Sequence, residues 1–230
     1  MAENYYAEKL NAAKLFQVYE TAIPRVRQYF EEEIRFVRQD LTGTERVLEV
    51  GAGYGRILRE LAPHAASLVG IDISEDSVVL GREYLADCPR CRMETMDVYR
   101  LPYEEAFDVV LCLQNGLSAM RGQASDLVAR CLRALVPGGR AYFSSYSSRF
   151  WETRLAWFRE QAQKGLLGEI DEEKTRDGVI VCVDGFRATT YSPEDLDRLG
   201  RETGCPYRVQ EVDESSVWLV LDKPVGHRPA

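Results

Sequence analysis

Short runs of apolar, often β-branched residues alternate along much of the chain with segments in which apolar residues recur every three or four positions. The short runs predict buried strands, and the segments between them predict helices. The run 107–113 is almost wholly apolar, which is typical of a central strand in a parallel sheet. The predicted strands are 46–50, 67–73, 92–95, 107–113 and 140–145. This alternation predicts an α/β fold with a doubly wound, mostly parallel sheet and helices on both faces.

Two regions interrupt the alternation. Residues 1–43 predict an N-terminal helical cap of two helices, with Pro24 in the first turn of the second. Residues 146–190 predict an insert, in which a helix rich in aromatic residues is followed by a hairpin around Asp184-Gly185. The main domain is expected over 44–230. It ends in a helix that Ser192 caps and in an antiparallel pair of strands, 207–211 and 217–222.

The first predicted strand leads into the most informative segment, Val47-Leu48-Glu49-Val50-Gly51-Ala52-Gly53-Tyr54-Gly55-Arg56. A strand, a glycine-rich turn and a helix in this order are typical of the start of a nucleotide-binding α/β unit. Glycine permits a positive φ and the close approach of a ligand to the backbone. A dinucleotide fingerprint requires its third glycine where this chain has Arg56. The glycines instead follow the pattern G-x-G-x-G, with Glu49 two residues ahead.

Other polar residues fall at the carboxyl ends of the predicted strands, where ligands of open α/β sheets bind. Asp72 ends the second strand, 21 residues after Gly51, which is about where an acid that binds ribose hydroxyls is expected. Asp72 is also suited to be a helix N-cap or a loop acid. Asp97 follows the third strand, and Gln114-Asn115-Gly116 follows the fourth.

These motifs resemble those of the class I S-adenosylmethionine-dependent methyltransferases, specifically over residues 44–145 and in general pattern over 190–222. The resemblance implies a seven-stranded sheet whose last strand is inserted antiparallel to the others. It implies S-adenosyl-L-methionine as the cofactor and S-adenosyl-L-homocysteine as the product. It also implies that Asp72 binds the ribose and that Asp97, with the backbone of Val98, binds the adenine. The predicted cofactor-binding residues are Glu49, Gly51, Ala52, Gly53, Asp72, Ile73, Asp97, Val98 and Gln114.

The sequence indicates less about the methyl acceptor than about the cofactor. The Gln114-Asn115-Gly116 turn resembles the family motif beside the methyl group, but it lacks the N-P-P-Y form used for the exocyclic amines of nucleic-acid bases. A small-molecule acceptor is therefore predicted, and the cap and the 146–190 insert are expected to form its pocket. The catalytic residues stay open, with Tyr6, Asn115 and Tyr146 as candidates. Asn115 is equally suited to making the turn, and the tyrosines to packing.

The composition of the chain limits the kinds of partner that it is expected to bind and the compartment in which it is expected to occur. The net charge of −8 and the pI of about 5.0 disfavour nonspecific binding to nucleic acid. No apolar run approaches the roughly 18 residues of a membrane span, and the first twenty residues lack the apolar core of a signal peptide. A cytoplasmic protein with free thiols is expected. Cys88-Pro89-Arg90-Cys91 has no second pair of metal ligands beside it in the sequence, so no metal is predicted.

Two alternatives to a methyltransferase stay open. The first is an NAD-dependent oxidoreductase on a similar sheet, against which Arg56 argues. The second is a non-catalytic S-adenosylmethionine-binding protein, against which the intact glycines and the two acids, Asp72 and Asp97, argue. The sequence leaves open the acceptor, the atom that is methylated, the need for a general base, the role of Cys88 and Cys91, and the choice between a monomer and a homodimer.

Overall fold

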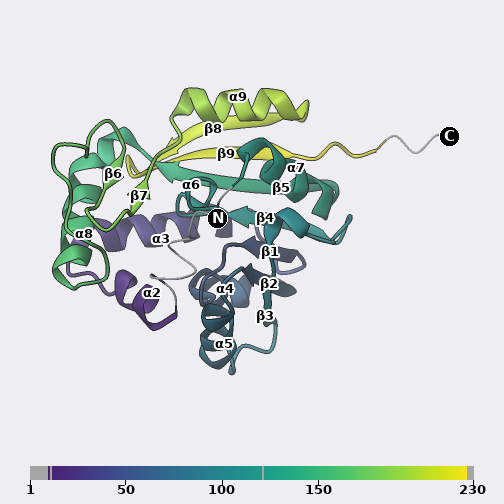
Figure 1. Cartoon of the computed structure of the whole chain (residues 1–230). Helices are drawn as coiled ribbons and strands as arrows, with labels where there is room; N and C mark the ends of the chain where they lie inside the picture. The colour runs from purple at the N-terminus through teal and green to yellow at the C-terminus, as the bar shows by residue number, and fades with distance from the viewer. Residues whose placement is uncertain (1–9, 11, 121, 227–230) are drawn as a thin grey trace.

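The computed structural model describes residues 10, 12–120 and 122–226. A seven-stranded sheet with the order β3-β2-β1-β4-β5-β9-β8 lies at its centre (Figure 1). The strands are β1 (Arg46–Val50), β2 (Ser67–Asp72), β3 (Cys91–Thr95), β4 (Phe107–Cys112), β5 (Leu135–Tyr146), β8 (Tyr207–Val212) and β9 (Ser216–Asp222). A separate small hairpin consists of β6 (Ile180–Val181) and β7 (Arg187–Ala188).

The helices follow the strands in the predicted alternation. They are α2 (Ala12–Tyr19), α3 (Pro24–Arg38), α4 (Arg56–Leu61), α5 (Glu75–Tyr84), α6 (Gly116–Ala119), α7 (Ala124–Ala134), α8 (Trp151–Gln163) and α9 (Pro193–Thr203). Short 3₁₀ turns occur at η1 (Ala62–His64), η2 (Val98–Arg100) and η3 (Ser148–Phe150). None of the helices in the described part of the chain is long and apolar enough to span a membrane.

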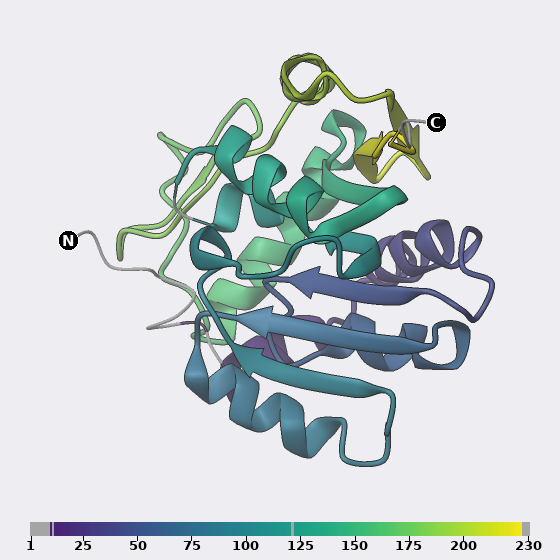
Figure 2. The same cartoon turned by 90° about the vertical axis from the view of Figure 1, so that its right-hand side faces the viewer.

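The sheet is parallel except at one inserted strand. β1 pairs in parallel with β2 and β4, and Figure 2 shows β1, β2 and β3 pointing the same way. β9 lies between β5 and β8 and is antiparallel to both, with Ala141 opposite Leu221. The predicted doubly wound fold and the antiparallel insertion implied by the resemblance are both confirmed. All the parallel strands therefore end at one edge of the sheet, where the glycine loop lies.

Each face of the sheet is covered by its own set of helices. Strand residues alternate between the faces, so that Leu48 packs in the cluster with α7 and α9 while Val47 packs with α3, α4 and α5. Trp218 is fully buried on the second of these faces. The apolar runs of the sequence are thus buried on both sides, as a doubly wound sheet requires.

The cap and the insert pack against each other and form a third apolar cluster, at the left of Figure 1. Phe30 of α3 and Trp157 of α8 meet edge to face with their ring centroids 5.3 Å apart. The indole N–H of Trp157 donates to the carbonyl of Val18 in α2, with an N···O distance of 3.2 Å. The aromatic stripe of the insert is therefore core, and it joins the insert to the N-terminal helices.

Two local predictions differ from the structure, and one short helix was not predicted. The strand predicted over 140–145 begins earlier, at Leu135 of β5, because Gly138 and Gly139 exchange backbone hydrogen bonds with Lys223 and extend it. The hairpin loop holds three residues rather than two, since Gly185 N donates to Cys182 O and Cys182 N donates to Phe186 O. The four-residue helix α6 was not predicted. The start of the predicted first helix, before residue 10, lies outside the described residues.

Candidate functional site

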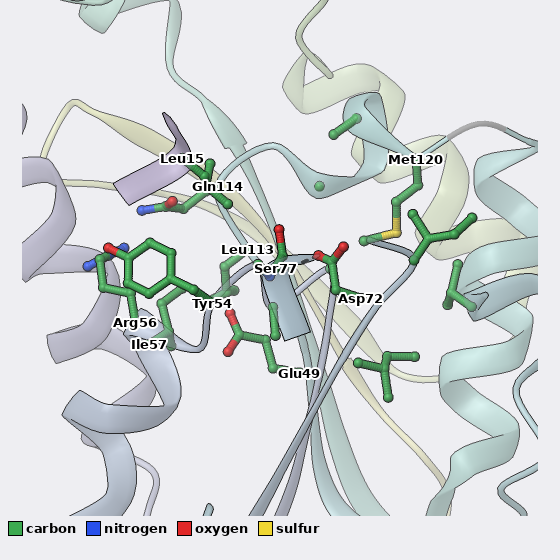
Figure 3. A pocket seen from close by; sticks show the side chains of 18 of the residues that line it. Leu15, Glu49, Tyr54, Arg56, Ile57, Asp72, Ser77, Leu113, Gln114 and Met120 are labelled. Carbon is green, nitrogen blue, oxygen red and sulfur yellow. Dashed lines mark hydrogen bonds between the residues drawn. The ribbon is translucent and has the colours of Figure 1, made fainter. Parts of the chain in front are cut away.

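A cavity opens at the carboxyl ends of β1, β2, β3 and β4, under helix α2 (Figure 3). The glycine loop after β1 forms its floor, and Leu10, Leu15 and Tyr19 approach it from the N-terminal segment. Its other lining residues are Glu49, Gly51, Ala52, Gly53, Tyr54, Arg56, Ile57, Ile71, Asp72, Ile73, Ser77, Met96, Asp97, Val98, Tyr99, Leu113, Gln114, Gly116, Ala119 and Met120.

The glycine loop depends on its glycines at two positions. Gly51 and Gly53 have φ values of 70° and 55°, in the left-handed region that a side chain disfavours. A Cβ on Gly53 would lie 2.6 Å from Cδ2 of Leu15, so helix α2 approaches the loop closely. Gly53 N donates to Oδ2 of Asp72 at 2.9 Å, which ties the loop to the end of β2.

Asp72 stands in the middle of the cavity with a fixed carboxylate. Its Oδ1 accepts from the backbone N–H of Ser74 at 2.9 Å, while Oδ2 accepts from Gly53. Burial raises the pKa of Asp72, and these backbone N–H groups oppose that rise. Each carboxylate oxygen has further acceptor capacity, and Figure 3 shows the group facing the cavity. Asp72 can therefore accept hydrogen bonds from vicinal hydroxyls of a ligand.

One end of the cavity is apolar with a single acid at its edge. Ile73 is 52% exposed beside the cavity, and Met96 and Val98 line the wall near it. Asp97 is held in place because its Oδ1 accepts from Tyr99 N at 2.9 Å. This combination suits a flat heteroaromatic ring that carries an amino group at its edge.

The opposite end is lined by charged and polar groups. Glu49 is only 4% exposed, and burial raises its pKa to about 8 although the nearby Arg56 opposes the rise. The Arg56 guanidinium lies 4.5 Å from the centroid of the Tyr19 ring and 5.0 Å from that of Phe30. The hydroxyl of Tyr19 donates to Oε1 of Gln114 at 2.6 Å.

Several polar atoms at this end have no hydrogen-bond partner among the described residues. They are the acceptor Oε2 of Glu49 and the donors Nε and Nη2 of Arg56 and Nε2 of Gln114. Buried polar groups are normally paired, so orphans gathered in one cavity indicate a missing ligand. An acid on one side and amide and guanidinium donors on the other match an ammonium and a carboxylate of an α-amino acid.

The structure brings all the predicted cofactor-binding residues to this one cavity. Of the predicted catalytic candidates, neither Asn115 nor Tyr146 lines the cavity. Tyr6 lies outside the described residues. Asn115 is buried beneath the loop, where its Nδ2 donates to Thr189 O and its Oδ1 accepts from Ser145 Oγ. Tyr146 packs against Tyr29 and does not line the cavity.

From the sequence, Arg56 was interpreted only as evidence against a dinucleotide site, and its position in the lining of the cavity was not predicted. One signal was available, because a cation in the first turn of a helix opposes the helix dipole and so calls for another explanation. Glu33 of α3 was missed as well. It is completely buried, and its approach to the site depends on how α3 packs over the sheet, which no local pattern reveals.

The sheet order and the position of the cavity are those of an α/β domain of the methyltransferase type. Residues 47–139 match a family model described as a methyltransferase domain. With its seven-stranded sheet and inserted antiparallel strand, the chain has the fold of the class I S-adenosylmethionine-dependent methyltransferases.

Individual relatives are distant. The ubiquinone/menaquinone biosynthesis C-methyltransferase UbiE of Geobacter sulfurreducens is 32% identical over 129 residues, which cover 53% of this chain and 49% of that protein. The chain thus spans about half the length of this curated relative. Solved structures of an S-adenosylmethionine-dependent methyltransferase from Methanosarcina mazei and of N-methyltransferase NodS from Bradyrhizobium japonicum, the latter in complex with S-adenosyl-L-homocysteine, have similar folds. The Methanosarcina mazei structure has a TM-score of 0.61 at 18% identity and covers 83% of this chain and 98% of its own chain. The NodS structure has a TM-score of 0.62 at 15% identity and covers 96% of this chain and 100% of its own chain.

Proposed function

We propose that this protein is a methyltransferase that uses S-adenosyl-L-methionine to methylate a small-molecule acceptor. The observation that carries the proposal is the order of groups along one cavity. An apolar end with Asp97 is followed by Asp72 and then by the orphaned polar atoms of Glu49, Arg56 and Gln114. Adenine, ribose and amino acid follow one another in the same order along the proposed methyl donor.

The chain's residues fit the donor part by part. Asp72 is suited to the ribose hydroxyls, and Asp97 with the Val98 backbone to the adenine edge. Glu49 would accept from the ammonium group, while Arg56 and Gln114 would donate to the carboxylate. The sulfonium of the bound donor supplies an already activated methyl group.

The protein's task is then mainly to align the reactants and exclude water. Tyr19 and Leu15 of α2 cover the cavity beside the glycine loop, and Tyr19 fixes the side chain of Gln114. Positioning of this kind can supply most of the acceleration of a displacement on an activated centre. Burial raises the pKa of Tyr19 to about 12, so near neutral pH its hydroxyl donates a hydrogen bond rather than removing a proton.

Charge, relatives and the packing of the N-terminal cap indicate the kind of acceptor and where it binds. The acidic chain and the names of the quinone-biosynthesis relatives favour a small molecule over nucleic acid. We assign the acceptor pocket to the cap, residues 1–43, and the insert, residues 146–190, which pack against each other next to the cavity. Tyr6 remains a candidate for contact with the acceptor. We also propose a cytoplasmic monomer or homodimer, to which the free cysteines are suited.

Titration calorimetry with S-adenosylmethionine, S-adenosylhomocysteine and NAD tests the proposal. We expect micromolar binding of the first two and none of NAD. Asp72→Ala removes the carboxylate assigned to the ribose and should weaken binding roughly 100-fold, since two charge-assisted hydrogen bonds are lost. The exposed Asp87→Ala, far from the cavity on the loop after α5, is the matched control. Binding of NAD alone, or unchanged affinity in Asp72→Ala, would contradict the assignment.

A further inference from the structure

The N-terminal cap also brings Glu33, in the middle of α3, close to the charged end of the site. Its exposed fraction is zero, whereas its neighbour Glu31 on the same helix is exposed. A carboxylate is rarely buried unless other groups compensate its charge. The groups that face Glu33 therefore indicate what it does.

Glu33 is linked through one hydroxyl to the backbone of Gln114. Its Oε1 accepts from Ser144 Oγ of β5, and the same Ser144 oxygen accepts from Gln114 N at 2.8 Å. Gln114 has a φ of 52° and the following Asn115 a φ of 62°, two consecutive left-handed residues that are not glycine. Such backbone persists only where its surroundings hold it, and Ser144 also accepts Asn115 N through its carbonyl at 3.1 Å. Glu33 thus supports the loop that presents Gln114 to the cavity.

Glu33 also contributes charge to the same end of the cavity. The guanidinium of Arg56 attracts both Glu33 and Glu49, so that one cation faces two buried acids. The hydroxyls of Tyr29, one turn earlier on α3, and of Tyr19 on α2 also lie close to Glu33. Burial raises the pKa of Glu33 to about 7, so the carboxylate is charged in mildly alkaline solution. Above about pH 8, where Glu49 is ionised as well, the three side chains carry a net charge of −1, which favours a cationic ligand.

We propose that Glu33 is a positioning residue that makes the site prefer the positively charged methyl donor over its neutral product. It acts through Ser144 on Gln114, and through the charge it shares with Arg56 and Glu49. The inference rests on the proposed function, because it takes S-adenosylmethionine as the ligand. S-Adenosylmethionine carries one more positive charge than S-adenosylhomocysteine, and that charge interacts with Glu33 in a region of low dielectric.

Titration of both ligands into the Glu33→Gln variant at about pH 8.5 tests this inference. Glutamine keeps the shape of the side chain but removes its charge. We expect S-adenosylmethionine to bind roughly tenfold more weakly and S-adenosylhomocysteine to lose much less affinity, so that their ratio of Kd values changes. Glu31→Gln, which removes the same charge from an exposed position two residues away, should leave both affinities unchanged.

Further variants separate charge from packing. Glu33→Asp keeps the charge and should retain the preference for the cationic ligand even if both affinities fall. Equal losses for both ligands in Glu33→Gln, or no loss, would overturn the inference, as would loss of the preference in Glu33→Asp. Failure of the wild type to bind either ligand would instead contradict the proposed function.

Discussion

At the scale of single residues, the site consists of ionisable groups whose burial is compensated only in part by the protein. Glu49 has a pKa raised to about 8 by burial, opposed by Arg56 and reinforced by Asp72 and Glu33. Without a ligand Glu49 therefore keeps its proton at neutral pH. An ammonium group placed against its unpaired oxygen would favour the ionised form, so ligand binding and proton release are coupled.

This coupling predicts a pH dependence of donor binding. Affinity for S-adenosylmethionine should rise between about pH 6 and pH 8 and become level above it, because below its pKa Glu49 must lose a proton to bind. Calorimetry in buffers of different ionisation enthalpy measures the protons released. Glu49→Gln should bind weakly and release fewer protons at the same pH, with Glu33 accounting for those that remain. An affinity that does not vary with pH in the wild type would contradict the assigned role of Glu49.

The raised pKa values affect the stability of the ligand-free protein in the opposite direction, because stability falls with pH where donor affinity rises. The folded pKa values of Glu49 and Glu33 lie above their unfolded values of about 4.3, so the folded state binds more protons in this range. The free energy of unfolding should therefore fall as pH rises from about 4.3 through 7 and 8. Glu49→Gln cannot ionise and should lessen this fall, which chemical unfolding at several pH values measures. If the free energy of unfolding of the wild type instead rises over this pH range, the raised pKa values of Glu49 and Glu33 are contradicted.

At the scale of elements, the sequence predicted those strands and turns whose conformation depends mainly on neighbouring residues in the chain. The bounds of β1 agree fully with prediction, because an apolar run and glycines with positive φ leave few alternatives. The position of β9 between β5 and β8 did not follow from the residues alone, since hairpin signals do not specify the neighbouring strand. Glu33 was missed for the same reason: its contacts with Ser144 and Arg56 join segments far apart in sequence.

Helix α2 and the glycine loop form the pair of elements that closes the cavity. Gly53→Ala places a Cβ 2.6 Å from Leu15 Cδ2, on backbone with a φ of 55°. We expect weaker donor binding and a loss of roughly 1–2 kcal/mol in stability from the left-handed alanine. Adding Leu15→Ala removes the clash and should restore part of the binding but not the backbone strain. If the double variant binds no better than Gly53→Ala, contact with α2 is not what limits the site.

At the scale of the whole molecule, the insert is connected to the charged end of the cavity through a row of packed aromatic side chains. Trp157 of α8 packs on Phe30 of α3, and Phe30 in turn supports the guanidinium of Arg56. The Trp157 N–H also holds α2 through the carbonyl of Val18. The cap and the insert thus share one cluster that is separate from the two cores on the faces of the sheet.

This arrangement predicts that a destabilising substitution in the insert disturbs the cavity but leaves the sheet intact. Trp157→Ala should leave a void and destabilise the cluster by roughly 3–5 kcal/mol, because the ring is 4% exposed. Amide hydrogen exchange should then quicken in α2, α3 and α8 while β1 and β4 stay protected, and donor affinity should fall as Arg56 loses its support. Trp157→Phe keeps a ring against Phe30 but lacks the N–H that bonds Val18, so it should show smaller effects of the same kind. Faster exchange spread evenly over the sheet would mean that the cap, the insert and the sheet unfold as one unit, and that the aromatic contacts do not by themselves couple the insert to the site.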